Sequence, residues 1–171
     1  MNMCIPDIYQ KSVFEVNYKK LFDRGIKCIL FDINNTLVPT NSKEIDDNLI
    51  SLFDNLKKIG INPILYADSS NKTVNIFKEK INIEGYSNVY FPFNKKMDEI
   101  LKQYKESELA IVGDLMIPDI KYGNKIGITT ILVNPISSKD SFKNIFRRRK
   151  EKHIMTRLRK NNLFVKGRYY E

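Results

Sequence analysis

The stretch Lys27-Cys28-Ile29-Leu30-Phe31-Asp32-Ile33 decides the fold that this sequence predicts. It is short and almost wholly apolar, which is typical of a β-strand buried on both faces. Strands of this kind belong to parallel sheets that carry helices on each side. The single acidic residue, Asp32, comes near the carboxyl end of the strand, where open α/β sheets bind their ligands.

Strand-like and helix-like patterns alternate after this stretch. They predict further strands at 61–67, 88–91, 109–112 and 128–133, and helices at 44–59, 72–81, 96–104 and 118–126. This alternation indicates βαβ units, and hence an α/β fold with a three-layer, doubly wound parallel sheet of about five strands. The length of 171 residues is that of one domain.

The excess positive charge is confined to the C-terminal part of the chain. Residues 139–171 hold 12 Lys and Arg against 3 Asp and Glu, whereas residues 1–138 hold 17 of each. We therefore expect an α/β core with an N-terminal extension at 1–138, and a basic, mostly helical segment at 139–171 that packs on the core or extends from it. Such a segment attracts an anionic membrane surface or RNA. The alternative is a solvated helix whose charges only confer solubility.

Residues 139–160 predict a long helix capped by Asp140 or Ser141. Its apolar residues form two stripes that fall on different faces of a helix with 3.6 residues per turn. We therefore expect a kink, or a helix that packs first on the body and then on a partner. The two stripes are Phe142, Ile145 and Phe146, and Ile154, Met155 and Leu158.

The sequence also excludes several classes of protein. The longest apolar runs have four residues or fewer, whereas a membrane-spanning helix needs about 20. The N-terminus lacks the basic start and apolar core of a secretory signal, and Cys4 and Cys28 are too few for a disulfide framework. We expect a cytoplasmic protein that can also associate peripherally with the inner membrane face.

Polar residues collect where the predicted strands end, and the carboxyl ends of parallel strands share one edge of the sheet. Carboxylates from two strands, with a lysine and hydroxyl groups nearby, suit Mg²⁺ together with a phosphate. An Asp after a strand is often only a helix cap, and Asp119 has the alternative role of bracing the helix at 118–126. The candidates are Asp32, Asn34, Asn35 and Thr36 after the first strand, Asp68 and Ser69 after the second, Lys95 after the third, and Asp114 and Asp119 after the fourth.

Two of these strand ends carry a family pattern. Residues 31–39 (FDINNTLVP) resemble the nucleophile loop of haloacid-dehalogenase-like (HAD) phosphatases, D-x-D-x-T after an apolar strand, and residues 112–119 (VGDLMIPD) resemble their metal-binding loop. Residues 123–133 (GNKIGITTILV) are similar to the subclass IIIA phosphatases that include the phosphatidylglycerophosphate phosphatases of bacteria and mitochondria. The resemblance runs nearly end to end.

The resemblance implies a mechanism and a set of roles. Asp32 would be the nucleophile that forms a transient aspartyl-phosphate, and Lys95 would pair with the phosphoryl oxygens. The single helices predicted between the first strands leave no room for a cap domain, so an open site for a large substrate such as a phosphate-bearing lipid is expected. The remaining roles are Mg²⁺ binding by Asp32, Asn34 (through its backbone carbonyl), Asp114 and Asp119, support of the loop by Thr36, and phosphate binding by Asn35, Asp68 and Ser69.

Two departures from the family pattern leave two functions open. The second Asp of the nucleophile loop, the general acid and base, is Asn34 here, and the usual Ser or Thr of the second motif is Ala67. Losing a general acid costs about 10²–10⁴ in rate. One hypothesis is a Mg²⁺-dependent phosphohydrolase with impaired activity, and the other is an inactive HAD scaffold that binds RNA, a ribonucleoprotein or an anionic membrane through its basic C-terminus. The sequence is silent on oligomeric state.

Overall fold

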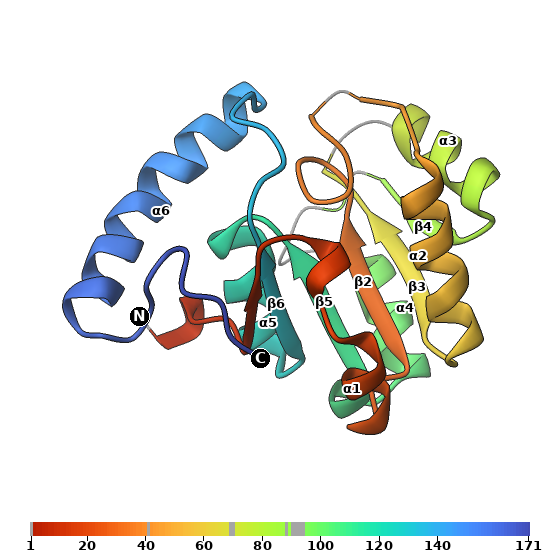
Figure 1. Ribbon diagram of the computed structural model, residues 1–171, viewed down its shortest axis with the longest axis horizontal. Helices are drawn as coiled ribbons and strands as arrows, with labels where there is room; N and C mark the ends of the chain where they lie inside the picture. The colour runs from red at the N-terminus through yellow and green to blue at the C-terminus, as the bar shows by residue number, and fades with distance from the viewer. Residues whose placement is uncertain (1, 41, 69–70, 88, 90–94) are drawn as a thin grey trace.

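The computed structural model describes residues 2–40, 42–68, 71–87, 89 and 95–171. In this part of the chain six strands form one sheet in the order β1-β6-β5-β2-β3-β4, and every pairing is parallel (Figure 1). The doubly wound parallel α/β sheet that the sequence predicts is therefore confirmed. The strands are β1 (Ile8–Gln10), β2 (Cys28–Asp32), β3 (Asn62–Tyr66), β4 (Glu84–Tyr86), β5 (Leu109–Gly113) and β6 (Thr129–Val133).

Helices connect the strands and cover both faces of the sheet. They are α1 (Tyr18–Asp23), α2 (Asp47–Lys58), α3 (Asn71–Ile81), α4 (Lys95–Gln103), the π-helix η4 (Met116–Lys121), α5 (Tyr122–Ile126) and α6 (Phe142–Lys160), with short 3₁₀ turns η1 (Asn2–Cys4), η2 (Val13–Glu15) and η3 (Glu106–Glu108). The helix predicted at 118–126 is thus a π-helix followed by a short α-helix.

The alternation of side chains along β2 explains the three layers. Ile29 and Phe31 belong to a core that includes residues of α1, α2 and α3, while Cys28 and Leu30 belong to a second core that includes residues of α4 and α5. All four side chains are at most 1% exposed. The strand is therefore buried on both faces, as its apolar run predicts.

The order of the strands places a functional edge beside β2. From β2 the chain moves outward to β3 and β4, and then returns to the other side of β2 as β5. Ligands of such sheets bind where the direction of winding reverses, at the carboxyl ends of the strands. In this sheet that point lies between β2 and β5, whose register pairs Phe31 with Val112.

Two strands differ from the sequence prediction. The strand predicted at 88–91 falls on residues of which only Val89 is described, and the strand between α3 and α4 is β4, a few residues earlier. β1 was not predicted, because three residues are too few to show a period. It pairs with β6, and Tyr9 also exchanges backbone hydrogen bonds of 2.8 and 2.9 Å with Tyr170 near the C-terminus.

The C-terminal segment packs against the core, and its first residues differ from expectation. α6 is one uninterrupted helix. Of the two predicted caps, Asp140 and Ser141, it is Ser141 whose hydroxyl accepts a hydrogen bond from the Asn144 backbone N–H. The first apolar stripe faces solvent in part, since Ile145 is 42% and Phe146 53% exposed, whereas Leu158 is fully buried. The helix therefore packs on the body through its second stripe rather than its first.

None of the helices in the described ranges has the length and apolar character needed to cross a bilayer.

Candidate active site

The ends of β2 and β5 meet at the hydroxyl group of Thr36. The Thr36 oxygen lies 3.1 Å from Oδ2 of Asp32 and 3.2 Å from Oδ1 of Asp114. The hydroxyl carries one proton, so it donates to one carboxylate at a time. Two acidic residues that are 82 positions apart in the chain therefore face one small volume, as the strand-end argument predicts.

A tight turn after β2 holds Thr36 in this place. Asn35 adopts a left-handed backbone conformation with φ of 63°, which asparagine tolerates better than most residues. Its N–H donates to the carbonyl of Val38 at 2.7 Å, and the N–H of Leu37 donates to Ile33 at 3.1 Å. The turn thereby aims the next side chain, Thr36, back at the strand end.

The side chain of Asn35 contacts the segment that leads to α6. Its amide donates to the carbonyl of Lys139 at 3.0 Å, and its amide oxygen accepts from the N–H of Ser137 at 3.2 Å. Asn35 is fully buried, so these bonds satisfy polar atoms that water does not reach. The structure gives this side chain a positioning role, and phosphate binding by Asn35 stays a prediction.

Asp119 lies against the same strand ends from η4. Its Oδ1 accepts a hydrogen bond of 2.8 Å from the hydroxyl of Tyr66, and its Oδ2 accepts one of 3.0 Å from the N–H of Leu115. The carboxylate packs so closely on Gly113 that a Cβ at that position would lie 2.1 Å from Asp119 Oδ2. Both oxygens of Asp119 therefore have partners, and its role as a metal ligand stays a prediction.

The carboxylates of this region raise one another's pKa. Burial raises the pKa of Asp32 well above its usual range, and the charges of Asp119, Asp114 and Asp68 add to the effect. Burial and Asp114 raise the pKa of Asp119 to about 8. Burial also raises the pKa of Asp114, although the neighbouring Arg148 opposes the shift. Negative charge is thus costly here, and a bound cation would offset that cost.

Helix α6 reaches into the same region with two arginines. Nη1 of Arg147 lies 2.8 Å from Oδ2 of Asp68, while Arg148 forms an ion pair with Asp114 and a second one, of 2.6 Å, with Asp140. α6 packs on η4, and Figure 1 shows its N-terminal end toward the carboxyl ends of the strands. The basic segment therefore contributes side chains to the site, which the sequence reasoning missed.

A polar stripe along α6 could have revealed this contact. Asn144, Arg147, Arg148 and Glu151 follow the i, i+3, i+4, i+7 spacing of one helix face. Asn144 is 5% and Glu151 4% exposed, and Glu151 accepts a hydrogen bond of 2.9 Å from the N–H of Ile117 in η4. Burial raises the pKa of Glu151 to about 7. The helix docks on the core by polar groups rather than by an apolar stripe alone.

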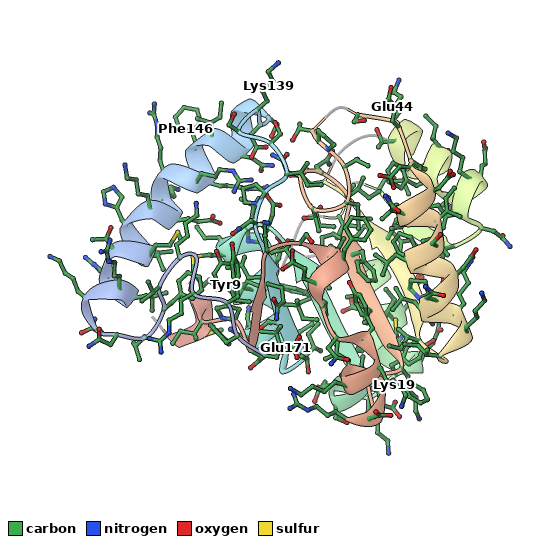
Figure 2. All side chains as sticks on the ribbon, viewed as in Figure 1. Tyr9, Lys19, Glu44, Lys139, Phe146 and Glu171 are labelled. Carbon is green, nitrogen blue, oxygen red and sulfur yellow. The ribbon has the colours of Figure 1, made fainter. Side chains whose placement is uncertain are left out.

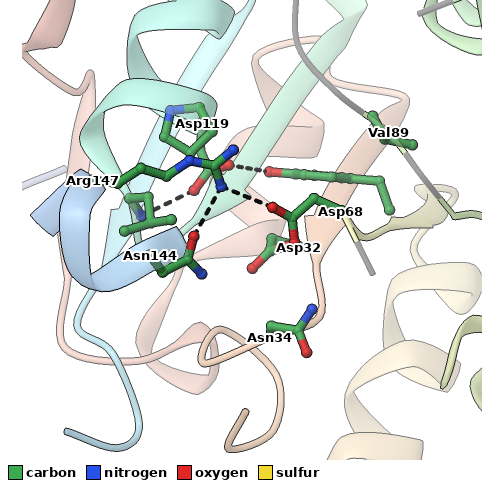
Figure 3. Close-up of a pocket in the computed structure, with 10 residues that line it drawn as sticks. Asp32, Asn34, Asp68, Val89, Asp119, Asn144 and Arg147 are labelled. Carbon is green, nitrogen blue, oxygen red and sulfur yellow. Dashed lines mark hydrogen bonds and ion pairs between the residues drawn. The ribbon is translucent and has the colours of Figure 1, made fainter. Parts of the chain in front are cut away.

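A small cavity of about 30 Å³ lies where these elements meet (Figure 3). Asp32 and Asn34 line it from the β2 side, and Arg147 lines it from α6. The predicted site residues Lys95, by its side chain, and Ser69 fall outside the described part of the chain, so their roles stay predictions. The other lining residues are Tyr66, Asp68, Val89, Leu115, Pro118, Asp119 and Asn144.

Comparison with known proteins gives a consistent result. A family model described as mitochondrial PGP phosphatase matches residues 1–137. The probable phosphatase YqeG of Bacillus subtilis is 29% identical over 158 residues, which span 91% of this chain and 92% of that protein. Phosphatidylglycerophosphate phosphatase 1, chloroplastic/mitochondrial, of Arabidopsis thaliana is 26% identical over 149 residues, which span 78% of this chain and 41% of that protein.

Solved structures support the fold. A putative HAD-superfamily (subfamily III A) hydrolase from Legionella pneumophila is 19% identical with a TM-score of 0.52, over 70% of each chain. The 3-deoxy-D-manno-octulosonate 8-phosphate phosphatase of Moraxella catarrhalis, solved with magnesium and phosphate ions, is 20% identical with a TM-score of 0.51, over 70% of this chain and 74% of that one. At these identities the likeness concerns the fold alone. The match over residues 1–137 goes further, and it shows that this chain belongs to the mitochondrial PGP phosphatase family of HAD-type phosphatases.

Proposed function

We propose that this protein is a Mg²⁺-dependent phosphohydrolase that removes the phosphate monoester of a lipid of the phosphatidylglycerophosphate class. The observation that carries the proposal is the meeting of Asp32 and Asp114 at the Thr36 hydroxyl, at the winding reversal of the sheet. The names of the two relatives above, a probable phosphatase and a phosphatidylglycerophosphate phosphatase, support the same reaction.

The donor atoms at this edge fit magnesium. The proposed ligands are carboxylate oxygens of Asp32 and Asp114 and the backbone carbonyl of Asn34. Mg²⁺ commonly takes one or two carboxylates and completes its shell with water and substrate oxygens. The described residues hold no cluster of three or more His, Cys, Asp or Glu side chains able to bind a metal, so the proposed site rests on the two carboxylates and the carbonyl alone. When bound, the ion would neutralise charge on the phosphoryl oxygens. Asp119 would serve by holding Leu115 and Tyr66 in place.

The chain's own residues would carry out two displacements. In the first, an ionised oxygen of Asp32 attacks phosphorus and the bond to the lipid oxygen breaks, which leaves an aspartyl-phosphate. In the second, water attacks the same phosphorus, so that inorganic phosphate leaves and the Asp32 carboxylate returns. Lys95 would pair with the phosphoryl oxygens. The leaving alkoxide would take its proton from water, because the amide of Asn34 cannot donate one as an acid does, and turnover is therefore slowed.

The surroundings favour a large anionic substrate. In the described residues single helices, α2 and α3, join β2 to β3 and β3 to β4, so this edge stays accessible. Figure 2 shows Lys139 and Phe146 at the same end of α6, the end that contributes Arg147 and Arg148 to the site. Exposed apolar and basic side chains together suit the surface of an anionic membrane. We propose that residues 139–171 hold the enzyme peripherally at an inner membrane face.

A second candidate function rests on the pair between Arg148 and Asp114. The guanidinium neutralises a carboxylate that magnesium would otherwise use. The methyl side chain of Ala67 cannot donate a hydrogen bond to phosphate, as the usual Ser or Thr would. An inactive HAD scaffold that binds RNA, a ribonucleoprotein or an anionic membrane through its basic segment would combine these features.

One comparison separates the two functions. Mg²⁺-dependent phosphate release is measured on phosphatidylglycerophosphate and on an aryl phosphate for the natural protein, Asn34→Asp and Asp32→Asn. A phosphatase predicts activity that Asp32→Asn abolishes and that Asn34→Asp raises by at least about 10-fold, because it restores a general acid. Release at the buffer background by both the natural protein and Asn34→Asp would refute the phosphatase.

A further inference from the structure

Arg147 differs in charge from the other described residues that line the cavity beside Asp32. Of the described side chains that line the cavity, it is the one cation. It belongs to α6, which begins at Phe142, beyond the residues 1–137 that the family model matches. Its position is thus independent of the motifs that assign the nucleophile and the metal ligands.

The guanidinium of Arg147 uses only part of its donor capacity. Nη1 bonds Oδ2 of Asp68 at 2.8 Å and Oδ1 of Asn144 at 2.9 Å (Figure 3). Within the described chain, its Nε and Nη2 atoms have no partner, and the side chain is 25% exposed. An arginine presents five N–H donors in a planar fork that fits phosphate oxygens. Arg147 is therefore equipped to accept an oxyanion that enters the cavity.

The ion pair between Arg147 and Asp68 lines the cavity. An anion that binds Nη1 of Arg147 must therefore compete with Asp68 for the guanidinium. Both partners of this pair are partly exposed, with 25% of each side chain accessible, and such pairs are weak. A substrate that offers its own anion to Arg147 compensates for the broken pair, whereas a substrate without that anion does not.

We propose that Arg147 binds a second anionic group of the substrate, a phosphodiester next to the phosphate monoester that is cleaved, and so determines specificity. This inference rests on the proposed function, in which Lys95 and magnesium hold the transferred phosphoryl group over Asp32. Among the described contacts Arg147 has no hydrogen bond to Asp32; its guanidinium bonds Asn144 of its own helix and Asp68, which follows β3. The preferred substrate is a lipid with two phosphates rather than one.

Two short-chain lipids test this directly. Dihexanoyl phosphatidylglycerophosphate and dihexanoyl phosphatidic acid share their acyl chains and a phosphate monoester, and only the first has a phosphodiester. Arg147→Gln is expected to raise KM for the first lipid by about 10- to 100-fold, as the loss of a charge-assisted hydrogen bond does, and to change KM for the second by less than about 3-fold. Arg147→Lys, which keeps the charge but loses the fork, is expected to lie between.

The matched control is Arg149→Gln. This change removes the same charge from the same helix, at an exposed position whose guanidinium lies over the ring of Phe146, and it is expected to leave the ratio of the two KM values unaltered. An equal loss on both lipids in Arg147→Gln, or a loss on neither, overturns the inference. Thermal unfolding of each variant separates a lost contact from a lost fold.

A binding measurement keeps this inference separate from the proposed reaction. The Kd of the full-length protein in Mg²⁺ is measured for glycerophosphoglycerol phosphate, which has both phosphates, and for glycerol 3-phosphate, which has one. The inference predicts that the natural protein binds the first at least about 10-fold more tightly and that Arg147→Gln abolishes this preference. If the protein binds glycerophosphoglycerol phosphate more tightly but hydrolyses neither lipid, the proposed function alone is refuted. If it hydrolyses the lipids but binds the two headgroup compounds equally, the role of Arg147 alone is refuted.

Discussion

Replacing Arg148 by glutamine is expected to destabilise the metal-free protein and to increase its stabilisation by magnesium. Arg148 pairs with Asp114, whose side chain is 1% exposed, and with Asp140, whose side chain is 2% exposed. The substitution keeps a polar, although shorter, side chain but removes the charge. It therefore leaves the Asp114 carboxylate buried without its cation.

The magnitude follows from the burial of the two partners. Removing one member of a buried ion pair costs about 3–5 kcal/mol, and Arg148, at 29% exposed, places the expected loss at the lower end, about 3 kcal/mol. For a chain of 171 residues this corresponds to a decrease in Tm of roughly 6–12 °C. The assay is thermal and urea unfolding in EDTA, with Arg149→Gln as the control that loses an exposed charge.

Magnesium should then distinguish Arg148→Gln from a simple loss of stability. In the natural protein the ion must displace the guanidinium from Asp114, whereas in the variant the carboxylate is free to bind it. Since a ligand that binds only the folded state adds RT ln(1 + [L]/Kd), the Tm increase between EDTA and 10 mM Mg²⁺ should be larger in the variant. Equal increases in both proteins would refute the competition between Arg148 and the ion. A Tm in EDTA equal to that of Arg149→Gln would refute the importance of the pair.

Two further predictions concern the bracing of Asp119. Gly113→Ala is expected to destabilise the protein by about 1–3 kcal/mol, in the range of overpacked cores, since its Cβ would lie 2.1 Å from Asp119 Oδ2; urea unfolding measures the loss, and an unchanged midpoint would contradict it. The pKa of Asp119, raised from 3.8 to about 8, means that the folded state binds this proton more tightly than the unfolded state. The stabilisation is complete below about pH 4 and decreases as pH rises toward 8. Urea unfolding in EDTA from pH 4 to 8.5 should show this decrease, and Asp119→Asn should flatten it; parallel slopes in the two proteins would assign the pH dependence to other groups.

Much of the core could be predicted because its signals are local. The run Cys28–Asp32 is buried on both faces and gives both the class of sheet and the place of Asp32. The meeting of Asp32 with Asp114 then follows from the topology of parallel sheets, in which carboxyl ends share an edge. No contact between distant residues had to be known for either step.

The contacts that the sequence does not reveal have a common physical feature, which is that they are non-local and polar. β1 is three residues long, and it is fixed by β6 and by Tyr170, which lie more than 120 positions away. The buried amide of Asn35 bonds the backbone of Ser137 and Lys139, a positioning role that the sequence does not predict, while phosphate binding by Asn35 stays a prediction. A side chain that satisfies distant backbone atoms has the same appearance in sequence as one that binds a ligand.

The prediction for the basic segment shows how charge alone can mislead. Its 12 cationic residues predict either attraction to an external anionic membrane or RNA, or a solvated helix, because residues 1–138 have no net charge. A net charge of zero over residues 1–138 is compatible with a local excess of negative charge, however. Four acidic residues gather at one edge of the sheet: Asp32, Asp68, Asp114 and Asp119. Arg147 and Arg148 pair with two of these acids, so part of the basic segment neutralises the protein's own site. Anything anionic that enters this site, or any cation that binds its carboxylates, must therefore exchange partners with α6.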